Sequence, residues 1–600
     1  MCGYLGQISY QDINNKIVSE CNEAIVCRGP DEKKILIGNS SNEFNASVDF
    51  NFSFIFNRLS ILDLSSNASQ PMVSEEFNTL LMFNGEVYNH EELREDLENN
   101  NIKFQSSHSD TEVILNGISH YGIKFVDKLV GQFSIVFIDF KINKIYLIRD
   151  RVGQKPLFYT HNNENLYFGS NLKSIKKMSN QKGVDDEQLN NFLNLGVVPS
   201  PFTIYENIYK VCPGEIIEFT FSNNKIFQDK YFYWEPSEFI SDEAFKDSEI
   251  IELMKESVNL RMRADVDIAN FLSGGIDSTS IIKMASENNK LNTYSMSIYE
   301  SSYDESKWFN FVSTKFKTNN TTINLDSENI SEEEILNSIN IFDEPYSDPS
   351  TIPSYLLSKE ISTKYKVAVS GDGGDELFGG YDRLSLTLQK KTLFSYVLSK
   401  LYKVYPAYLG TGNRLLRHSR DVNTSFPSFL EDKKLMSLLG VKSKFNFSKN
   451  YLNNSEDKIK NILIAEIKFY LSEMMMLKVD RTSMANSLEV RSPFVDHRLI
   501  EYILMHNFES ENLKNPKKIL KNYLKPEFSD EFVNRKKMGF VFDLENWVYR
   551  NKTFITSKIK SSEALDHLNT NKLLRLYKFK SRINALRIWK LFFLAIYLNE

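Results

Sequence analysis

The stretch that decides the fold is Val266-Asp267-Ile268-Ala269-Asn270-Phe271-Leu272, followed at once by Ser273-Gly274-Gly275-Ile276-Asp277-Ser278. The first seven residues have the composition of a buried strand, and residues 280–285 continue as a helix. Between the two, Gly274 and Gly275 allow the backbone to approach an anion closely. The N–H groups that open the helix point at such an anion. This order predicts a phosphate-binding loop.

The loop differs from a Walker A loop, which would end in Gly-Lys-Ser/Thr. Kinase-type transfer of the γ-phosphoryl group is therefore disfavoured. The Ser-Gly-Gly-x-Asp-Ser form instead indicates enzymes that adenylate a substrate and release pyrophosphate. The alternative is a generic glycine turn, which the strand before the loop and the helix after it disfavour.

Further strands are predicted downstream of this loop at residues 292–298, 321–325 and 367–370, and they alternate with helical segments. Strands that alternate with helices predict a parallel, doubly wound sheet. In such a sheet, ligands bind at the carboxyl ends of the strands.

A second glycine-rich loop, Ser370-Gly371-Asp372-Gly373-Gly374-Asp375, follows the strand at 367–370. It places two carboxylates, Asp372 and Asp375, beside the predicted phosphate site. Mg²⁺ is a hard cation that binds a few carboxylates together with substrate phosphates. The second loop therefore predicts a magnesium site.

The first 200 or so residues have a different pattern, with short β-type runs separated by turn residues. Examples are residues 52–56, 79–83, 133–138 and 144–148. This pattern predicts a sheet-rich α+β layer fold. The pattern changes near residue 242, and residues 231–243 form the expected junction.

The chain begins Met1-Cys2-Gly3, so removal of Met1 leaves cysteine as the N-terminal residue. A free α-amine has a pKa of about 7.7–8, so it can act as a general base at neutral pH. It can take the thiol proton directly or through one water, which gives the reactive thiolate. The alternative is an accidental cysteine at a disordered end.

Four further segments bear on this alternative: Arg28-Gly29-Pro30-Asp31, residues 58–63, Phe83-Asn84-Gly85-Glu86-Val87-Tyr88-Asn89 and Ser109-Asp110-Thr111-Glu112. In these the chain resembles the class II (N-terminal nucleophile) glutamine amidotransferases, and most closely the asparagine synthetase (glutamine-hydrolysing) family. The resemblance implies a glutaminase domain of two packed antiparallel sheets at 2–220. An α/β parallel-sheet adenine-nucleotide (PP-loop) synthetase domain at 242–600 would follow.

The resemblance also implies roles at a glutamine site. Cys2 would be the nucleophile, and Asn84 and Gly85 would supply the oxyanion hole. Arg58 would bind the glutamine carboxylate and Asp110 its ammonium group. The other glutamine-binding residues would be Leu59, Ser60, Ile61, Leu62 and Glu86. One departure is Cys27, because the family usually has histidine before Arg-Gly-Pro-Asp.

The same resemblance implies an ATP site formed by Leu272, Ser273, Gly274, Gly275, Asp277, Ser278, Met296, Ser370 and Gly371. Asp277 and Asp375 would hold Mg²⁺. Asp372 would be catalytic, at a position where some members have glutamate. Lys537, in the segment 535–540, would stabilise the adenylation transition state, and its alternative is a surface lysine. Glu489 and Arg491 lie in another family-like segment, and the alternative interpretation for them is a buried ion pair.

Composition limits the classes of partner. The 600-residue chain has a net charge of −6 and a pI of about 5.9, so no bulk field favours nucleic acid or an anionic membrane. Its four cysteines, at 2, 21, 27 and 212, form no C-x-x-C pair, which argues against a zinc site or a disulfide framework. No apolar run approaches the roughly 18–20 residues of a membrane span. The start lacks the basic region of a signal peptide. A cytoplasmic location is expected.

The predicted reaction converts ATP, L-aspartate, L-glutamine and water to AMP, diphosphate, L-asparagine and L-glutamate through an acyl-adenylate. The alternative is the same machinery acting on another carboxylate, such as a sugar uronate of a surface polysaccharide. A regulatory protein without activity is a third interpretation, which the intact motifs disfavour. The partners expected are small-molecule substrates. The acceptor, the course of an ammonia path and the oligomeric state, including a homodimer, stay open.

Overall fold

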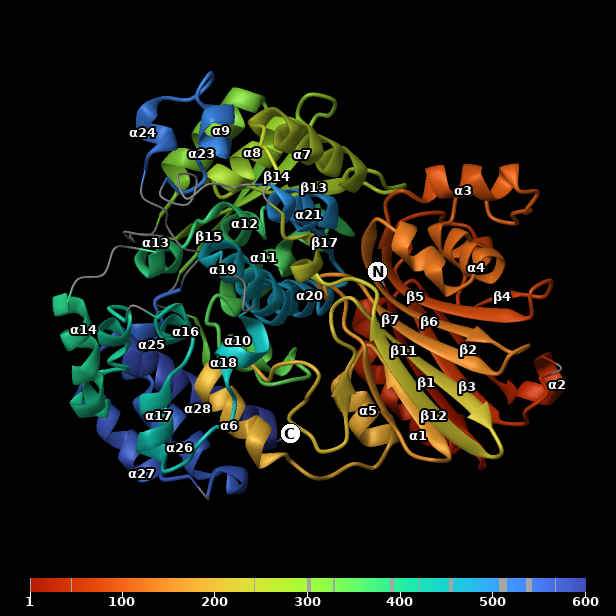
Figure 1. Ribbon diagram of the computed structural model, residues 1–600, viewed down its shortest axis with the longest axis horizontal. Coiled ribbons are helices and arrows are strands. Elements are labelled where there is room, and N and C mark those ends of the chain that lie inside the picture. Colours follow the sequence, from red (N-terminus) through yellow and green to blue (C-terminus); the bar gives the residue numbers. More distant parts are fainter. Residues whose placement is uncertain are drawn as a thin grey trace.

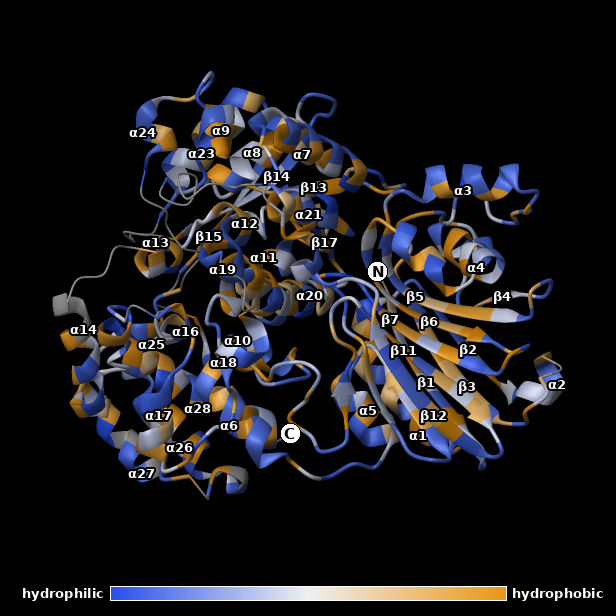
Figure 2. Cartoon of the chain, viewed as in Figure 1, coloured by the Kyte–Doolittle hydropathy of each residue, from blue (hydrophilic) through white to orange (hydrophobic). Residues whose placement is uncertain are grey.

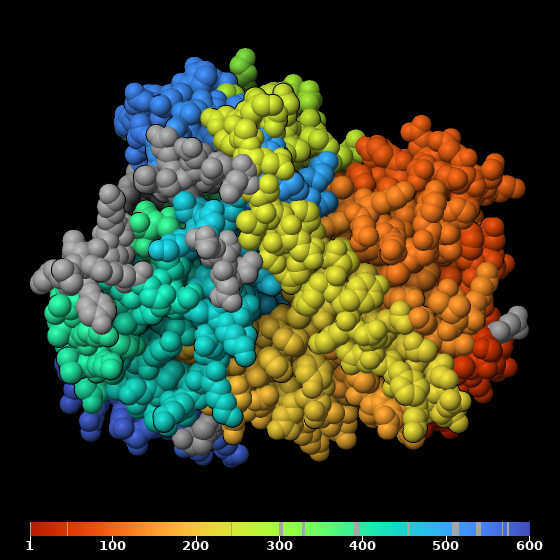
Figure 3. All heavy atoms as spheres, viewed as in Figure 1, coloured from red at the N-terminus to blue at the C-terminus, as the bar shows by residue number. Residues whose placement is uncertain are grey.

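The structure is a computed structural model that describes residues 2–44, 46–241, 243–298, 304–326, 330–388, 393–419, 421–452, 457–506, 515–535, 542–566 and 568–599. Figure 1 shows two parts side by side. The first, red to yellow, is dominated by strands, and the second, green to blue, by helices around a smaller sheet. In the space-filling view of Figure 3 the two parts meet along one broad seam.

The first part contains two antiparallel sheets. One has the strand order β10-β8-β9-β1-β3-β2 and the other β12-β11-β7-β6-β5-β4. The strands are β1 (Cys2–Ser9), β2 (Glu32–Asn39), β3 (Asn51–Arg58), β4 (Met72–Ser74), β5 (Thr79–Val87), β6 (Gly131–Asp139), β7 (Lys144–Arg149), β8 (Phe158–His161), β9 (Asn165–Gly169), β10 (Tyr209–Lys210), β11 (Glu215–Ser222) and β12 (Lys225–Phe232). The four strand runs predicted from the sequence are confirmed within β3, β5, β6 and β7.

The facing surfaces of the two sheets pack together. Tyr4 and Phe54 from the first sheet share a buried core with Leu80 and Val136 from the second. Hydrophobic residues follow these strands in Figure 2. Helices α3 (His90–Asn99) and α4 (Asp110–Tyr121) cover the outer face of the second sheet, whereas α1 (Asn15–Cys21) and α5 (Leu172–Met178) pack beside the first. This four-layer arrangement confirms the predicted N-terminal-nucleophile architecture.

The second part is built on a five-stranded parallel sheet of order β15-β14-β13-β16-β17. Its strands are β13 (Ile268–Phe271), β14 (Asn292–Ile298), β15 (Asn319–Leu325), β16 (Val367–Val369) and β17 (Glu489–Arg491). The chain leaves β13 toward β14 on one side and returns to β16 on the other. The carboxyl end of β13 therefore lies at the point where the strand order reverses, where such sheets bind ligands.

Helices surround this sheet and extend away from it. They are α6 (Asp186–Leu195), α7 (Asp247–Arg261), α8 (Ile276–Ala285), α9 (Ser306–Phe316), α10 (Glu332–Asn340), α11 (Thr351–Ile361), α12 (Gly374–Phe378), α13 (Asp382–Leu388), α14 (Leu393–Lys400), α15 (Asn413–Leu416), α16 (Val422–Ser425), α17 (Lys433–Leu439), α18 (Phe447–Tyr451), α19 (Lys458–Ala465), α20 (Leu477–Met484), α21 (His497–Met505), α23 (Lys518–Leu524), α24 (Asp530–Val533), α25 (Leu544–Arg550), α26 (Lys552–Lys560), α27 (Thr570–Leu573) and α28 (Arg582–Asn599). A π-helical stretch, Glu466–Met476, joins α19 to α20. No helix among the described residues is both long enough and apolar enough to span a bilayer.

Candidate active sites

The predicted nucleophile lies at the start of the central strand β1. Cys2 pairs with Arg58 at the end of β3, and its side chain is buried. Burial raises the pKa of the Cys2 thiol, and a hydrogen bond from the Leu59 backbone opposes that rise. The Cys2 nitrogen, which becomes the α-amine once Met1 is removed, lies 2.9 Å from Asn84 Oδ1. The sheet thus holds the nitrogen and the thiol of Cys2 in a dry environment.

Asn84 and Gly85 lie side by side on β5, directly opposite this nitrogen. Asn84 is fully buried, and its Nδ2 has no hydrogen-bond partner among the described residues. Leaving a buried amide donor without a partner costs roughly 1–3 kcal/mol of stability, so this N–H group is available to bind an acceptor on a ligand. A Cβ at Gly85 would lie 2.0 Å from the Gln132 carbonyl oxygen, so only glycine fits this close strand pairing.

Arg58 is buried and points into the loop that follows β3. Its Nη1 donates to the Ser65 carbonyl at 3.0 Å, and its Nη2 donates to the Asp63 and Leu62 carbonyls. Glu32 lies 3.5 Å from the same guanidinium. The chain therefore fixes the Arg58 fork through neutral backbone carbonyls and one half-exposed carboxylate.

The neighbouring residues Leu59 and Ile61 have a packing role that the sequence did not indicate. Their buried side chains form a small apolar cluster with Val367 of β16 and Met484 of α20. The Ser60 nitrogen donates to Asp31 at 2.7 Å. The side chains of Leu59 and Ile61 therefore join the two parts of the molecule, and only their backbone groups are left to face a ligand.

Two carboxylates lie at the other side of this site. Asp110, the first residue of α4, accepts a hydrogen bond from the Val87 nitrogen at 3.0 Å, and burial raises its pKa. Glu86 is also buried, which raises its pKa well above the usual range. Arg491 of β17 lies 3.1 Å from Glu86. The structure therefore ties Glu86 to the second part of the chain.

The predicted phosphate loop connects β13 to α8. Gly274 has a φ of +73°, and a Cβ there would lie 2.6 Å from the Phe309 nitrogen. The Gly275 nitrogen donates to Ser273 Oγ at 3.1 Å, and Ser273 Oγ lies 3.1 Å from Ser278 Oγ. The tight turn and the helix that follows confirm the predicted strand–loop–helix order.

The second glycine loop lies against the first because β16 is the direct neighbour of β13. A Cβ at Gly371 would lie 3.1 Å from the Ser278 nitrogen, and one at Gly374 would lie 2.8 Å from the Asp277 carboxylate carbon. Met296 is buried on β14, on the other side of β13. The ATP-site residues predicted from the sequence therefore lie together around the end of β13.

Lys517 bridges the two carboxylates for which a metal was predicted. Its Nζ lies 2.5 Å from Asp375 and also forms an ion pair with Asp277. Although burial opposes the charged form, these two carboxylates raise the pKa of Lys517. Its φ of +59° is uncommon for lysine, and such strain concentrates at functional sites. The pair of carboxylates thus converges on one position that holds a positive charge.

The remaining predicted residues surround this centre. Asp372 Oδ2 accepts a hydrogen bond from Ser370 Oγ at 2.8 Å. Arg535 donates to the Gly274 carbonyl at 2.5 Å, so it anchors the phosphate loop. Lys537 lies outside the described residues. Among the described residues no group of three or more His, Cys, Asp or Glu side chains is placed to hold a metal.

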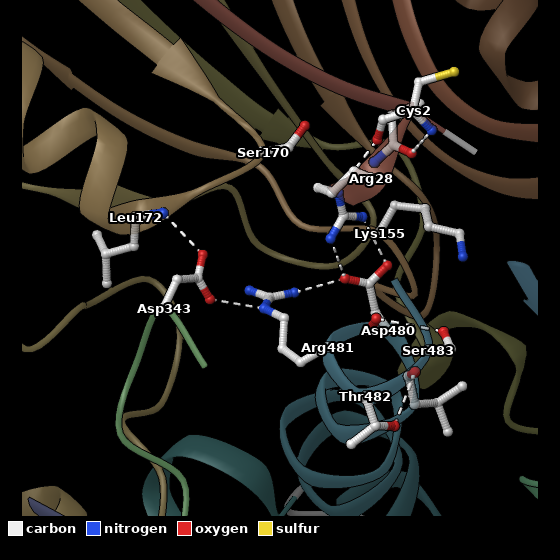
Figure 4. A network of polar contacts seen from close by, with 12 residues as sticks. Cys2, Arg28, Lys155, Ser170, Leu172, Asp343, Asp480, Arg481, Thr482 and Ser483 are labelled. Carbon is white, nitrogen blue, oxygen red and sulfur yellow. Dashed lines mark hydrogen bonds and ion pairs between the residues drawn. The ribbon is translucent and has the colours of Figure 1, made fainter. Parts of the chain in front are cut away.

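A buried chain of ion pairs connects the Cys2 strand to the second part (Figure 4). Arg28 donates through Nε to the Cys2 carbonyl at 3.2 Å and through its two Nη atoms to Asp480 at 2.8 and 2.9 Å. Asp480 also binds Arg481, whose Nε reaches Asp343 at 2.7 Å. Asp343 in turn accepts from the Leu172 nitrogen at 2.8 Å.

The charges in this chain are strongly coupled. Although burial opposes ionisation, Arg28 and Arg481 hold the pKa of Asp480 well below its usual range. Burial lowers the pKa of the nearby Lys155, and Asp480 opposes that change. Cys27, beside Arg28, contributes its backbone carbonyl to Ser487 at 2.6 Å, while the residue itself is exposed.

Sequence reasoning missed Lys517, Lys155 and the role of Asp480. Asp480 and Arg481 lie in a segment that resembles the family, but no motif showed that they meet Arg28. The pair Glu489 and Arg491 is a buried ion pair at 2.6 Å, and Arg491 also binds Glu86. A lone lysine such as Lys517 carries no sequence signal of its own.

Comparison with known proteins agrees with this geometry. Residues 249–598 match the family described as asparagine synthase, and residues 1–234 match the glutamine amidotransferase domain. The chain is 29% identical to asparagine synthetase [glutamine-hydrolyzing] 1 of Bacillus subtilis, over 100% of this chain and 96% of that one.

Two further relatives span less of the chain. It is 32% identical to a putative asparagine synthetase [glutamine-hydrolyzing] 2 of Methanocaldococcus jannaschii, over 64% of this chain and 76% of the relative. It is 25% identical to amidase chyE of Penicillium rubens, over 82% and 81%. With a family model matched over each of its two parts, the chain belongs to the asparagine synthase family of glutamine-dependent carbon–nitrogen ligases.

Proposed function

We propose that the first site releases ammonia from glutamine. The Cys2 α-amine takes the thiol proton, and the thiolate attacks the side-chain amide carbon. The oxyanion that forms accepts hydrogen bonds from Asn84 Nδ2 and the Gly85 N–H. The carbon–nitrogen bond then breaks, ammonia leaves with the proton held by the amine, and water hydrolyses the thioester to glutamate. The free Nδ2 of Asn84 beside the Cys2 nitrogen supports this assignment.

Arg58 and Asp110 would orient the substrate in this site. The Arg58 guanidinium suits the glutamine carboxylate, and Asp110 suits the ammonium group. Both side chains are buried; Arg58 is the strand partner of Cys2, and Asp110 accepts a hydrogen bond from Val87 at the end of β5. Substrate binding would then require the carboxylate to share the Arg58 fork with the carbonyls of the loop at 62–65.

We propose that the second site activates a carboxylate with ATP. A carboxylate oxygen of the acceptor attacks the α-phosphorus, and pyrophosphate leaves. Ammonia then attacks the acyl carbon, AMP departs, and the surplus proton goes to a nearby base such as Asp372. The N–H groups of residues 274–278 would hold the phosphates. Lys537 is assigned to the same transition state from the family resemblance.

Asp277 and Asp375 are the residues that would hold Mg²⁺. Their convergence on the ammonium of Lys517 supports this assignment, because the pair already stabilises one cation there. Carboxylate oxygens are also the ligand type that Mg²⁺ prefers. When bound, the metal supplies positive charge against the phosphates.

The observation that carries the proposal is the presence of both centres in one chain, joined by the buried Arg28–Asp480 pair. A lone glutaminase would need no second centre, and a lone ligase would need no cysteine at the first. We propose L-aspartate as the acceptor and asparagine as the product. The uronate alternative differs only in the acid.

The decisive experiment measures pyrophosphate release from Mg-ATP across a panel of carboxylates that includes L-aspartate and a hexuronic acid. We expect the largest stimulation by aspartate, with asparagine formed when glutamine is added. Stimulation by a uronate alone would show that the acceptor is a uronate and not aspartate, and the proposed ligase reaction would otherwise stand. Absence of pyrophosphate with every acid, in a protein that still hydrolyses glutamine, would contradict the ligase assignment.

A further inference from the structure

The charge of the chain is unevenly distributed. Residues 383–420 contain eight Lys and Arg and no Asp or Glu, and residues 567–599 contain seven and none. The whole chain has a net charge of −6. The remainder is therefore strongly acidic, and two separate stretches carry a concentrated positive charge.

The fold brings these two stretches together. Tyr408 stacks on Phe579 with ring centroids 5.9 Å apart. Asn584 Nδ2 donates to the Tyr408 carbonyl at 2.9 Å, and Arg587 donates to the Ala407 carbonyl at 2.7 Å. In Figure 1 this region, with α14 and α28, lies on the side of the molecule away from the two antiparallel sheets.

Large apolar side chains are exposed on this same region. Val397, Leu401 and Val404 are 57%, 46% and 76% exposed, and they recur at helical spacing along α14 and the 3-10 turn Leu401–Val404. Leu409, Phe579 and Ile583 continue the row and are 55%, 43% and 38% exposed. A Cβ at Gly410, next to Leu409, would lie 3.5 Å from Ile583 Cδ1. The Tyr405 hydroxyl, next to Val404, donates to the Leu409 carbonyl at 3.1 Å, so the segments that carry these apolar residues are in contact.

Exposed cations flank this row of apolar residues. Lys403, Arg414, Lys578 and Arg582 are exposed, and none of them forms an ion pair with any other residue that the structure describes. Arg575 and Lys580 are exposed nearby. We call the six apolar residues and these cations the basic apolar face.

We propose that the basic apolar face docks the enzyme onto an anionic lipid bilayer. Apolar side chains between lysines and arginines are the pattern of segments that lie in the membrane interface. Each basic residue near an anionic surface contributes attraction there. A nucleic acid would leave Val404 and Leu409 in water. A second copy of the chain would bring cations against cations.

The test uses the full-length protein and sedimentation with phosphatidylcholine vesicles that contain or lack phosphatidylglycerol. We expect binding only with phosphatidylglycerol, weakened by salt. Lys403→Glu with Lys578→Glu should weaken binding by at least about 25-fold, since each cation contributes roughly fivefold. Val404→Asp should also weaken it, by roughly tenfold or more.

The matched control is Ile142→Asp with Lys141→Glu, an exposed apolar and basic pair in the turn between β6 and β7. This double variant should bind vesicles like the wild type. Glutamine-dependent turnover without vesicles should be equal in all variants, which confirms their folding. Wild-type protein that ignores phosphatidylglycerol, or face variants that bind as tightly as wild type, would overturn the proposal. So would Val404→Asp changing the oligomeric mass with no change in vesicle binding.

Discussion

The two centres of this chain solve different electrostatic problems. Beside Cys2 the sheet buries a neutral donor, Asn84 Nδ2, which has no protein partner in the described chain. Around Asp277 and Asp375 the loops instead balance two negative charges with Lys517. In the function proposed above, the first centre breaks an amide bond and needs a preformed place for one oxyanion. The second centre would receive a triphosphate, so it would need cations that can be redistributed.

The largest expected effect separates the two centres outright. Cys2→Ala removes the nucleophile, so glutamine-dependent synthesis should fall by at least about 10⁴-fold. Synthesis from added ammonia should stay largely intact, because ammonia enters after the missing step. The measurement is product formation with each nitrogen source on one preparation. Equal loss of both activities in a folded variant would show that the two centres are not separable.

The next largest effect is a loss of activity at the second centre with the first centre left intact. Asp277→Asn should reduce pyrophosphate release by about 10²–10³-fold, since it removes a charge that opposes the phosphates through the metal. Basal hydrolysis of glutamine should persist. The matched control is Asp267→Asn, an exposed carboxylate at the other end of the same strand region. Pyrophosphate release near the wild-type rate in Asp277→Asn would exclude the loop at 273–278 as the ATP site.

The sequence predicted the local features of these two centres but not the contacts between residues that are far apart in the chain. The loop at 273–278 and Cys2 are local features: the loop is predicted by its glycines between a strand and a helix, and Cys2 by its position directly after Met1. Lys517 and Asp480 each meet a partner more than a hundred positions away, Asp277 and Arg28 respectively, and no local pattern in the sequence pairs them. The family resemblance assigns Leu59 and Ile61 to glutamine binding, which stays a prediction, and no sequence pattern showed that their side chains pack against Val367.

Whole-chain averages also conceal local features. The net charge of −6 predicted no preference for an anionic membrane. The exposed cations Lys403 and Lys578, one from each basic stretch, come onto neighbouring segments only when Tyr408 and Phe579 meet. Sequence periodicity cannot show that contact, because it joins two segments of the second domain that are far apart in the chain.

The Arg28–Asp480 pair lies at the contact between the two parts of the molecule that carry the centres. Asp480→Asn keeps the shape of the Arg28 pair but removes its negative charge, which leaves Arg28 under-compensated beside the Cys2 carbonyl. We expect ATP-coupled use of glutamine to fall by about tenfold, the factor that 1.4 kcal/mol produces, while synthesis from ammonia changes little. The measurement is glutamate formed per pyrophosphate released.

The chain offers a close control for that variant. Asp432 forms an equally buried pair with Arg587, at 2.6 and 2.7 Å, in the C-terminal helices. Arginine lowers the pKa of both carboxyls despite burial, so each stabilises the fold above pH about 4 and loses that contribution as the pH falls. Asp432→Asn should therefore share the loss of stability but keep the ratio of glutamate to pyrophosphate. A changed ratio in Asp432→Asn as well would make the effect of Asp480 merely structural.

The last expected effect is on stability and not on turnover, and it concerns Glu376, which follows Asp375 in the second loop. Burial, with the charge of Asp375, raises the pKa of Glu376 to about 7, and Tyr381 donates to it at 2.7 Å. Between pH 4.5 and 7 the folded chain thus holds a proton that the unfolded chain has lost. The contribution of Glu376 to stability then falls as the pH rises, by about 3 kcal/mol in all.

Glu376→Gln keeps the neutral hydrogen-bonding shape and cannot ionise, so it should lack this decline. The measurement is the free energy of unfolding in urea from pH 5 to 8, taken as the difference between variant and wild type. Glu252→Gln, an exposed site on α7, is the control and should leave the wild-type slope unchanged. Parallel curves for Glu376→Gln and wild type would mean that Glu376 is ionised throughout. The second centre would then hold three negative charges near Lys517, so cations other than Lys517 would have to compensate them.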